Sequence, residues 1–160
     1  MSFASTMRFA LASLPKAEFG FPGPMRDRLV AAVLDGRKTA TTALLAAYEG
    51  AGEQPPQTGD QALLVDSAGR TVAVIETTDM RVVPLRDVDE AHVAAEGEGH
   101  GSVAEWRAEH EEFWHSARMR AELRDPGFTV DDATQVVLER FRVQAVLRSR
   151  DGRAEAHSGR

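Results

Sequence analysis

Between residues 23 and 36 an apolar residue recurs every three or four positions, which is the first regular pattern in the chain. This spacing gathers apolar side chains on one face of a helix, and Pro24 suits the first helical turn. Gly36 follows the last apolar residue and is typical of a helix that ends in a left-handed turn. We therefore predict an amphipathic helix that begins at Gly23-Pro24 and ends before Gly36, with a second helical piece at 43–48.

Farther along, the pattern changes from helical spacing to alternation. Residues 62–65 and 71–77 are rich in aliphatic and β-branched residues and flank a segment of turn-forming residues, which predicts a β-hairpin. A short strand is expected around 80–83, ended by Pro84, and a last strand from about 135 to 147.

Two more helical regions are predicted between these strands. Residues 85–95 have helical spacing, and Ser102 followed by Glu105 has the form of a capping box at a helix start. The helix that follows carries Trp106 in its apolar stripe and is broken at 125–127. Because helices and strands do not alternate as βαβ units, we predict an α+β fold with a mixed, mostly antiparallel sheet or small barrel and flanking helices.

The chain has 160 residues and no cysteine. This length suits one domain, which we place at 17–147 between tails at 1–16 and 148–160. The absence of cysteine excludes disulfides, thiolate metal sites and a cysteine nucleophile. The apolar stretch at 9–14 is far shorter than the ~20 residues of a membrane span, so we expect a cytoplasmic protein with no membrane partner.

The formal net charge is −6. Affinity for long polyanions comes mainly from Lys and Arg side chains that displace counterions from phosphates. The acidic charge therefore favours a nucleoside or another small ligand over a long nucleic-acid surface, while short single-stranded RNA stays open as a partner.

Residues 36–42, Gly-Arg-Lys-Thr-Ala-Thr-Thr, place a lysine and several hydroxyl groups just beyond the first predicted helix. In a partly apolar cleft Lys38 would lose solvation and could serve as a base, and the Thr41 hydroxyl lies within its reach as a nucleophile. The structural alternative is a cation that complements the helix dipole and threonines that make turn hydrogen bonds.

A second candidate segment is 96–101, Glu-Gly-Glu-Gly-His-Gly, which is predicted to be a loop between two helices. Glycines on both sides of Glu98 allow the backbone to aim its carboxylate into a cleft, where it could act as general acid or base. The alternative is a solvated linker. The glycine spacing is not that of a dinucleotide-binding loop, and no cofactor is expected.

A zinc site at His110 and His115 is not expected, because two histidines five residues apart diverge on a helix. Among the aromatic residues that could stack on a base, Trp106 has the spacing of a core residue. Tyr48, next to a flexible linker, is the better stacking candidate.

Several short motifs follow one another over residues 17–147: Phe19-Gly20, Gly36-Arg37-Lys38-Thr39-Ala40-Thr41, Gly59-Asp60, Val74-Ile75-Glu76-Thr77-Thr78, Ala95-Glu96-Gly97-Glu98-Gly99, Trp106-Arg107-x-x-His110-x-x-Phe113 and Glu139-Arg140-Phe141. Taken in this order, they resemble the longer bacterial proteins of the ASCH-domain family. The resemblance implies a β-barrel similar to that of PUA domains, with a cleft between the barrel and the flanking helices.

The resemblance also implies a function. Proteins of the family are associated with RNA, and its small amidohydrolases remove the acetyl group from N4-acetylcytidine with a lysine, a threonine and a glutamate, which correspond here to Lys38, Thr41 and Glu98. An amidohydrolase acting on an N4-acylated cytidine or a related modified nucleoside is therefore expected. The long helical region after Trp106, which the small amidohydrolases lack, makes a different acyl-nucleoside or an RNA end a possible substrate.

Four further residues are expected to bind the substrate of this site: Arg37, Tyr48, Glu76 and Arg107. Arg37 or Arg107 would neutralise a developing oxyanion, and Tyr48 would stack on the base. The alternative function is an RNA-binding module, with or without ribonuclease activity, that uses the same cleft. The oligomeric state is not predicted.

Overall fold

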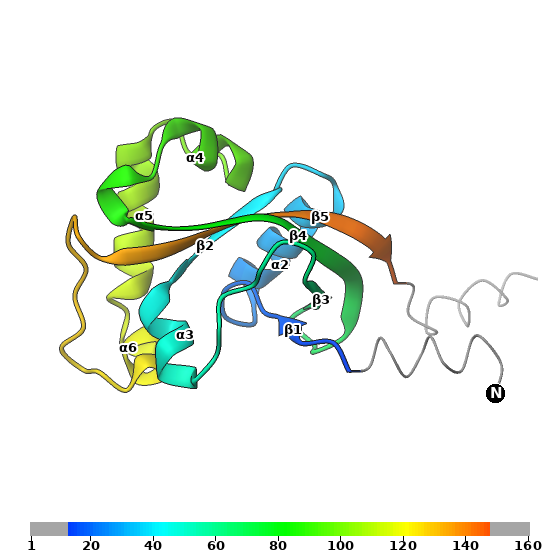
Figure 1. Cartoon of the computed structure of the whole chain (residues 1–160), viewed down its shortest axis with the longest axis horizontal. Coiled ribbons are helices and arrows are strands. Elements are labelled where there is room, and N and C mark those ends of the chain that lie inside the picture. Colours follow the sequence, from blue (N-terminus) through cyan, green and yellow to red (C-terminus); the bar gives the residue numbers. More distant parts are fainter. Residues whose placement is uncertain (1–12, 148–160) are drawn as a thin grey trace, which may run out of the picture.

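The computed structural model describes residues 13–147, so the predicted tails lie mostly outside the described residues. Figure 1 shows the elements in chain order. They are β1 (Lys16–Ala17), α2 (Pro24–Leu34), β2 (Ala40–Leu44), α3 (Leu45–Ala51), β3 (Gln61–Val65), β4 (Thr71–Pro84), the 3-10 helix η1 (Leu85–Asp87), α4 (Glu90–Glu96), α5 (Val103–Trp114), α6 (Ala117–Leu123) and β5 (Gln135–Val146).

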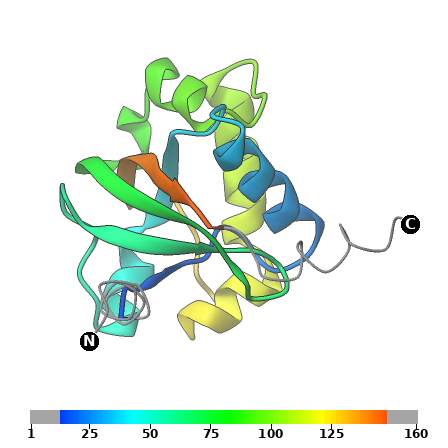
Figure 2. The same cartoon turned by 90° about the vertical axis from the view of Figure 1, so that its right-hand side faces the viewer.

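The five strands form one sheet in the order β1-β3-β4-β5-β2. The β1 and β3 strands are parallel, and the other neighbours are antiparallel. The long strands β4 and β5 curve strongly, as Figure 2 shows. The α+β class and the mostly antiparallel sheet are confirmed, although within residues 13–147 the sheet is curved and open and does not close into a barrel.

Three predicted boundaries are corrected by the structure. The hairpin strand and the short strand near 80–83 are one strand, β4, whose pairing with β5 shifts register between Thr77 and Asp79. The threonine segment before α3 is strand β2, which is too short to show alternation in the sequence. The helix after Ser102 ends at Trp114, and Ser116 caps a separate helix, α6.

Strands β2 and β5 separate two apolar clusters because successive side chains of a strand point to opposite faces. On one face, Leu44 and Leu138 pack with Trp106, which is fully buried as the sequence analysis predicted. On the other face, Phe141 packs with Val33 of α2. Figure 1 shows α4 and α5 at one end of the sheet and α2 against its curved face.

Within residues 13–147, no helix has the length and apolar character needed to cross a membrane.

Candidate functional site

Lys38 is carried by the connection between α2 and β2. The helix ends at Leu34 with Asp35 as its C-cap, and Gly36 then turns the chain with a φ of 87°. The Lys38 amide then donates to the Ala32 carbonyl at 3.0 Å, so the residue is tied to the last turn of α2. Its side chain is only 2% exposed, and Nζ donates to the Ala40 carbonyl at 2.8 Å.

Glu98 reaches Lys38 because α4 ends directly on this connection. Gly97 follows α4 with a φ of 63°, and a Cβ atom there would lie 2.0 Å from the Arg37 carbonyl oxygen. Next to this contact, the Thr39 amide donates to the Ala95 carbonyl at 2.8 Å. The result is an ion pair between residues 60 positions apart, with Lys38 Nζ 3.6 Å from Glu98 Oε2.

The two carboxyl groups near Lys38 have pKa values shifted in opposite directions. Burial raises the pKa of Glu98 to about 7, and a hydrogen bond and like charge from Glu96 add to this shift, against the opposing charge of Lys38. Burial also pushes the pKa of Glu96 upward, but the hydrogen bond with His92 and the charges of Lys38 and His110 outweigh it, so this pKa lies well below its usual value. Glu96 is therefore a fixed carboxylate, and Glu98 is a group that exchanges a proton near neutral pH.

Glu96 is the centre of a buried hydrogen-bond network. It is 1% exposed, and it accepts hydrogen bonds from Thr42 Oγ1 at 2.6 Å and from Trp106 Nε1. Because the single hydroxyl proton of Thr42 goes to Glu96, His92 Nε2 must donate to Thr42 Oγ1 across their 2.7 Å contact. Nδ1 of His92 has no hydrogen-bond partner among the described residues, which fits the neutral tautomer with the proton on Nε2.

His110 also faces this network. Its Nδ1 donates to the Trp106 carbonyl at 2.9 Å, so in the neutral ring Nε2 is the basic nitrogen, and it lies 3.6 Å from Glu96 Oε2. Burial lowers the pKa of His110, and the charges of Lys38 and His100 act in the same direction against the opposing effect of Glu96. The histidine is therefore predominantly neutral near pH 7.

Glu96, Glu98 and His110 bring their ligand atoms within 4.8 Å of one another, and these ligand types suit a divalent cation. The ammonium group of Lys38 already supplies positive charge at this point, and Glu96 is occupied by its hydrogen-bond donors. The same acidic groups therefore also act as charge partners of Lys38. His115 lies elsewhere, where its Nε2 accepts from the Val130 amide at 3.0 Å.

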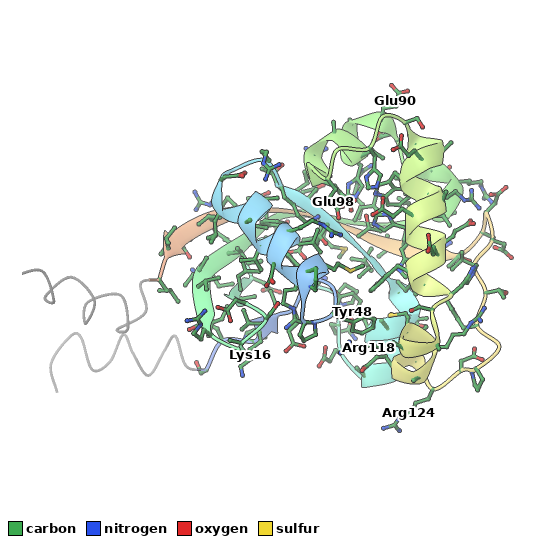
Figure 3. All side chains as sticks on the ribbon, turned by 180° about the vertical axis from the view of Figure 1, so that it is seen from behind. Lys16, Tyr48, Glu90, Glu98, Arg118 and Arg124 are labelled. Atoms are coloured by element: carbon green, nitrogen blue, oxygen red, sulfur yellow. The ribbon has the colours of Figure 1, made fainter. Side chains whose placement is uncertain are left out.

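Lys38 and Glu98 open into a cleft of about 1910 Å³, which Thr41, Tyr48 and Arg37 also line. Thr41 and Thr42 point to opposite faces of β2, so Thr42 belongs to the buried network and Thr41 to the cleft. The Thr41 hydroxyl has no hydrogen bond to any described residue. Figure 3 shows Glu98 beside α4 and Tyr48 on α3, farther along.

Arg37 and Tyr48 both line the cleft but differ in exposure and charge. The Arg37 guanidinium is exposed and pairs with Asp35 at 2.8 Å. Burial, with the nearby charges of Glu139 and Glu53, raises the pKa of Tyr48 to about 12. Tyr48 is therefore a neutral phenol within the cleft.

Two predicted substrate-binding residues lie outside the cleft lining. The Glu76 carboxylate forms an ion pair with the Arg142 guanidinium at 2.5 Å, between strands β4 and β5. Arg107 is held by Glu111 at 2.9 Å and by Asp132 at 2.6 Å on the outer side of α5. Both side chains are engaged in these ion pairs away from the cleft lining, and their role in substrate binding stays a prediction.

The network residues Thr42, His92 and Glu96 were not predicted from the sequence as site residues. One signal for them exists, because His92 and Glu96 are four residues apart and therefore share a face of α4. That face is buried, with both residues at 1% exposure or less. Polar residues at helical spacing on a buried face indicate a satisfied network rather than a solvated surface.

The raised pKa of Glu98 predicts a pH-dependent stability. Between the pKa values of the unfolded and folded states, about 4.5 and about 7, the unfolded chain loses its proton first. The contribution of Glu98 is therefore greatest below pH 4.5, declines as pH rises and is lost above 7, with a total change of up to about 3 kcal/mol. Urea unfolding of wild type and Glu98→Gln, measured from below pH 4.5 to above pH 7, should show that the stability of wild type relative to the variant declines as the pH rises. A difference in the free energy of unfolding that stays constant with pH would contradict the raised pKa of Glu98.

Comparisons with known proteins agree with this architecture. A family model described as the ASCH domain matches residues 17–145. A protein of Enterococcus faecalis V583 has 27% sequence identity and a TM-score of 0.73, with 89% of this chain and 83% of that chain covered. An ASCH domain from Lactobacillus crispatus JV V101 has 27% identity and a TM-score of 0.70, with 89% and 86% covered. No curated protein matches the chain.

Proposed function

Since the chain belongs to the ASCH domain family, we propose that it is an amidohydrolase that acts on an N4-acylated cytidine or a related modified nucleoside. The observation that carries the proposal is the pairing of a buried lysine with a glutamate that has a pKa of about 7, inside an open cleft. A carboxyl group with this pKa can take up and release a proton at neutral pH, as amide hydrolysis requires.

In the proposed reaction, the Glu98 carboxylate removes a proton from a water molecule as the water oxygen bonds to the amide carbonyl carbon. The ammonium group of Lys38 stabilises the oxyanion that forms, and Glu96 balances its charge. Glu98 then gives the proton to N4 as the carbon–nitrogen bond breaks. The products are the free cytidine and a carboxylic acid.

Water is the proposed nucleophile because no base among the described residues is hydrogen-bonded to the Thr41 hydroxyl. Lys38 Nζ instead donates to the Ala40 carbonyl. The Thr41 hydroxyl, which lines the cleft, would orient the water or the substrate carbonyl. Thr41→Val should therefore retain more turnover than Lys38→Met, whereas a nucleophilic threonine would make Thr41→Val inactive.

The test is release of cytidine from N4-acetylcytidine by the purified full-length chain. Turnover by wild type and its loss in folded Lys38→Met would support the proposal. A folded wild type without turnover on N4-acetylcytidine or other N4-acylcytidines would overturn it.

The rate should depend on pH through Glu98. Because the attack step needs the carboxylate, kcat at saturating substrate should rise about tenfold per pH unit below the pKa of about 7 and level off above it. Initial rates from pH 5 to 9 in buffers of constant ionic strength measure this profile. If the rate instead fell as the pH rose through 7, the reaction would require the protonated form of Glu98. That result would contradict its proposed role as the base.

A second candidate is binding of a short RNA end in the same cleft. The cleft volume of about 1910 Å³ exceeds the ~300–1,000 Å³ of an ordinary small-molecule pocket. Its lining includes Arg118, whose guanidinium lies 4.1 Å from the centre of the Phe21 ring. A binder of several phosphates weakens steeply with salt, so binding of a short single-stranded RNA measured from 50 to 200 mM salt discriminates this function from hydrolysis of a neutral nucleoside.

A further inference from the structure

The cleft contains a second buried acid that the proposed reaction does not use. Glu139 on β5 is 8% exposed and lines the cleft. Its Oε2 atom accepts a hydrogen bond from Thr77 Oγ1 at 2.7 Å, and no cation of the described residues forms an ion pair with it. A buried carboxyl group without a cation favours its uncharged form, and such a group inside a cleft is a candidate for contact with a ligand.

The surroundings of Glu139 favour its uncharged form. Burial raises its pKa, and the nearby charge of Asp60 adds to this effect, against the hydrogen bond from Thr77. A protonated carboxyl group offers one hydrogen-bond donor and one acceptor side by side. Since Thr77 contacts only Oε2, the Oε1 side is available to a ligand in the cleft.

Glu139 lies on the same cleft wall as the Lys38 site. Thr41 is its direct cross-strand partner in β2, so the two side chains share a face. Phe141, two residues along the same face of β5, has its ring centre 5.6 Å from that of Phe19. Lys38 Nζ in turn lies 5.8 Å from the centre of the Phe19 ring. Lys38, Phe19, Thr41 and Glu139 therefore all line the same cleft.

We infer that Glu139 recognises the substrate heterocycle, by donating a hydrogen bond from its carboxyl group to N3 of the pyrimidine and accepting one from N4–H. An N4-acylated cytosine keeps one N4 hydrogen beside the N3 lone pair, so it presents the complementary pair. Thr77 holds the carboxyl group in place, and Tyr48, whose pKa the charge of Glu139 helps to raise, lines the same cleft. The inference rests on the proposed function and adds the residue that selects the base.

Two substitutions of Glu139 separate recognition from packing. Glu139→Gln keeps one donor and one acceptor and should change KM for N4-acetylcytidine by less than about fivefold. Glu139→Leu has a similar size without either group, and it should raise KM about 10- to 100-fold while kcat changes little. Thermal unfolding followed by circular dichroism checks that both variants fold. Glu112→Leu, an exposed change on α5 outside the cleft, is the matched control and should behave as wild type.

A substrate without the N3 atom gives a readout that a structural role would not change. N-acetylaniline keeps the amide N–H but has no ring nitrogen, so Glu139→Leu should lose much less activity on it than on N4-acetylcytidine. Equal losses on both substrates would overturn the inference, as would an unchanged KM of Glu139→Leu for N4-acetylcytidine.

Equilibrium binding distinguishes failure of this inference from failure of the proposed function. Cytidine carries the same N3 and N4–H edge and needs no turnover, and isothermal titration calorimetry measures its affinity. If wild type binds cytidine and Glu139→Leu binds it about 10- to 100-fold more weakly, recognition by Glu139 stands even where N4-acetylcytidine is not hydrolysed. Equal cytidine affinity in both proteins, or no binding by wild type, would overturn it.

Discussion

Replacing Glu98 by Gln is expected to lower kcat for N4-acetylcytidine by about 10²- to 10⁴-fold, the usual contribution of a general acid–base group. The glutamine side chain keeps the size of Glu98 but can neither take a proton from water nor give one to the leaving N4. Since the substituted group is partly exposed, with 19% of its side chain accessible, the fold should survive. KM should change little, because in the proposed reaction Glu98 acts on the reacting atoms and not on the rest of the substrate.

The matched control for this change is Glu90→Gln. Glu90 is an exposed glutamate at the opposite end of α4, as Figure 3 shows, and its kcat should equal that of wild type. Steady-state rates from cytidine release, with circular dichroism for folding, give both values. A folded Glu98→Gln variant with wild-type kcat would remove Glu98 from the mechanism.

Gly97→Ala is expected to destabilise the protein by about 2–4 kcal/mol and to abolish turnover. The added Cβ would lie 2.0 Å from the Arg37 carbonyl oxygen and 2.9 Å from the Lys38 amide nitrogen, both backbone atoms that no side-chain rotation can move. Alanine also disfavours the φ of 63° found here. The end of α4 must therefore move away from the connection between α2 and β2, which separates Glu98 from Lys38.

Gly99→Ala isolates the effect of this close approach. Gly99 also has a positive φ, 84°, but a Cβ there meets nothing within 4 Å. Gly99→Ala should therefore destabilise the protein only through the unfavourable positive φ of alanine, by about 1–2 kcal/mol. Urea unfolding and turnover measured on both variants decide the point, and equal effects of the two changes would show that the close contact is not important.

The local parts of this site could be predicted from the sequence, whereas their assembly could not. Helical spacing and Gly36 place Lys38 just after a helix, and the glycines around Glu98 indicate a loop, because these are short-range effects. That Lys38 and Glu98 meet depends on a backbone contact between Gly97 and Arg37. Only the family resemblance indicated such a meeting, since no pattern in the sequence encodes a contact over 60 positions.

In the fold as well, local features could be predicted from the sequence and long-range pairing could not. The long strand β5 and the helix α2 have periods that sequence reading detects, and both lie close to their predicted limits. Strand β2 has five residues and two threonines in succession, so its assignment depends on pairing with β5. The ion pairs of Glu76 and Arg107 could not be predicted from the sequence, because each residue finds an oppositely charged partner that is distant in sequence or on another element.

The hydrogen bond from the Thr39 amide to the Ala95 carbonyl, 2.8 Å long, makes this amide a probe of motion at the site. It is part of neither a helix nor a strand ladder, and it joins the two segments that carry Lys38 and Glu98. Deuterium should therefore enter at Thr39 whenever α4 separates from the start of β2, even while the sheet stays intact. Its exchange rate, compared with that of amides in the β4–β5 ladder, would measure how often the cleft wall opens without unfolding of the domain.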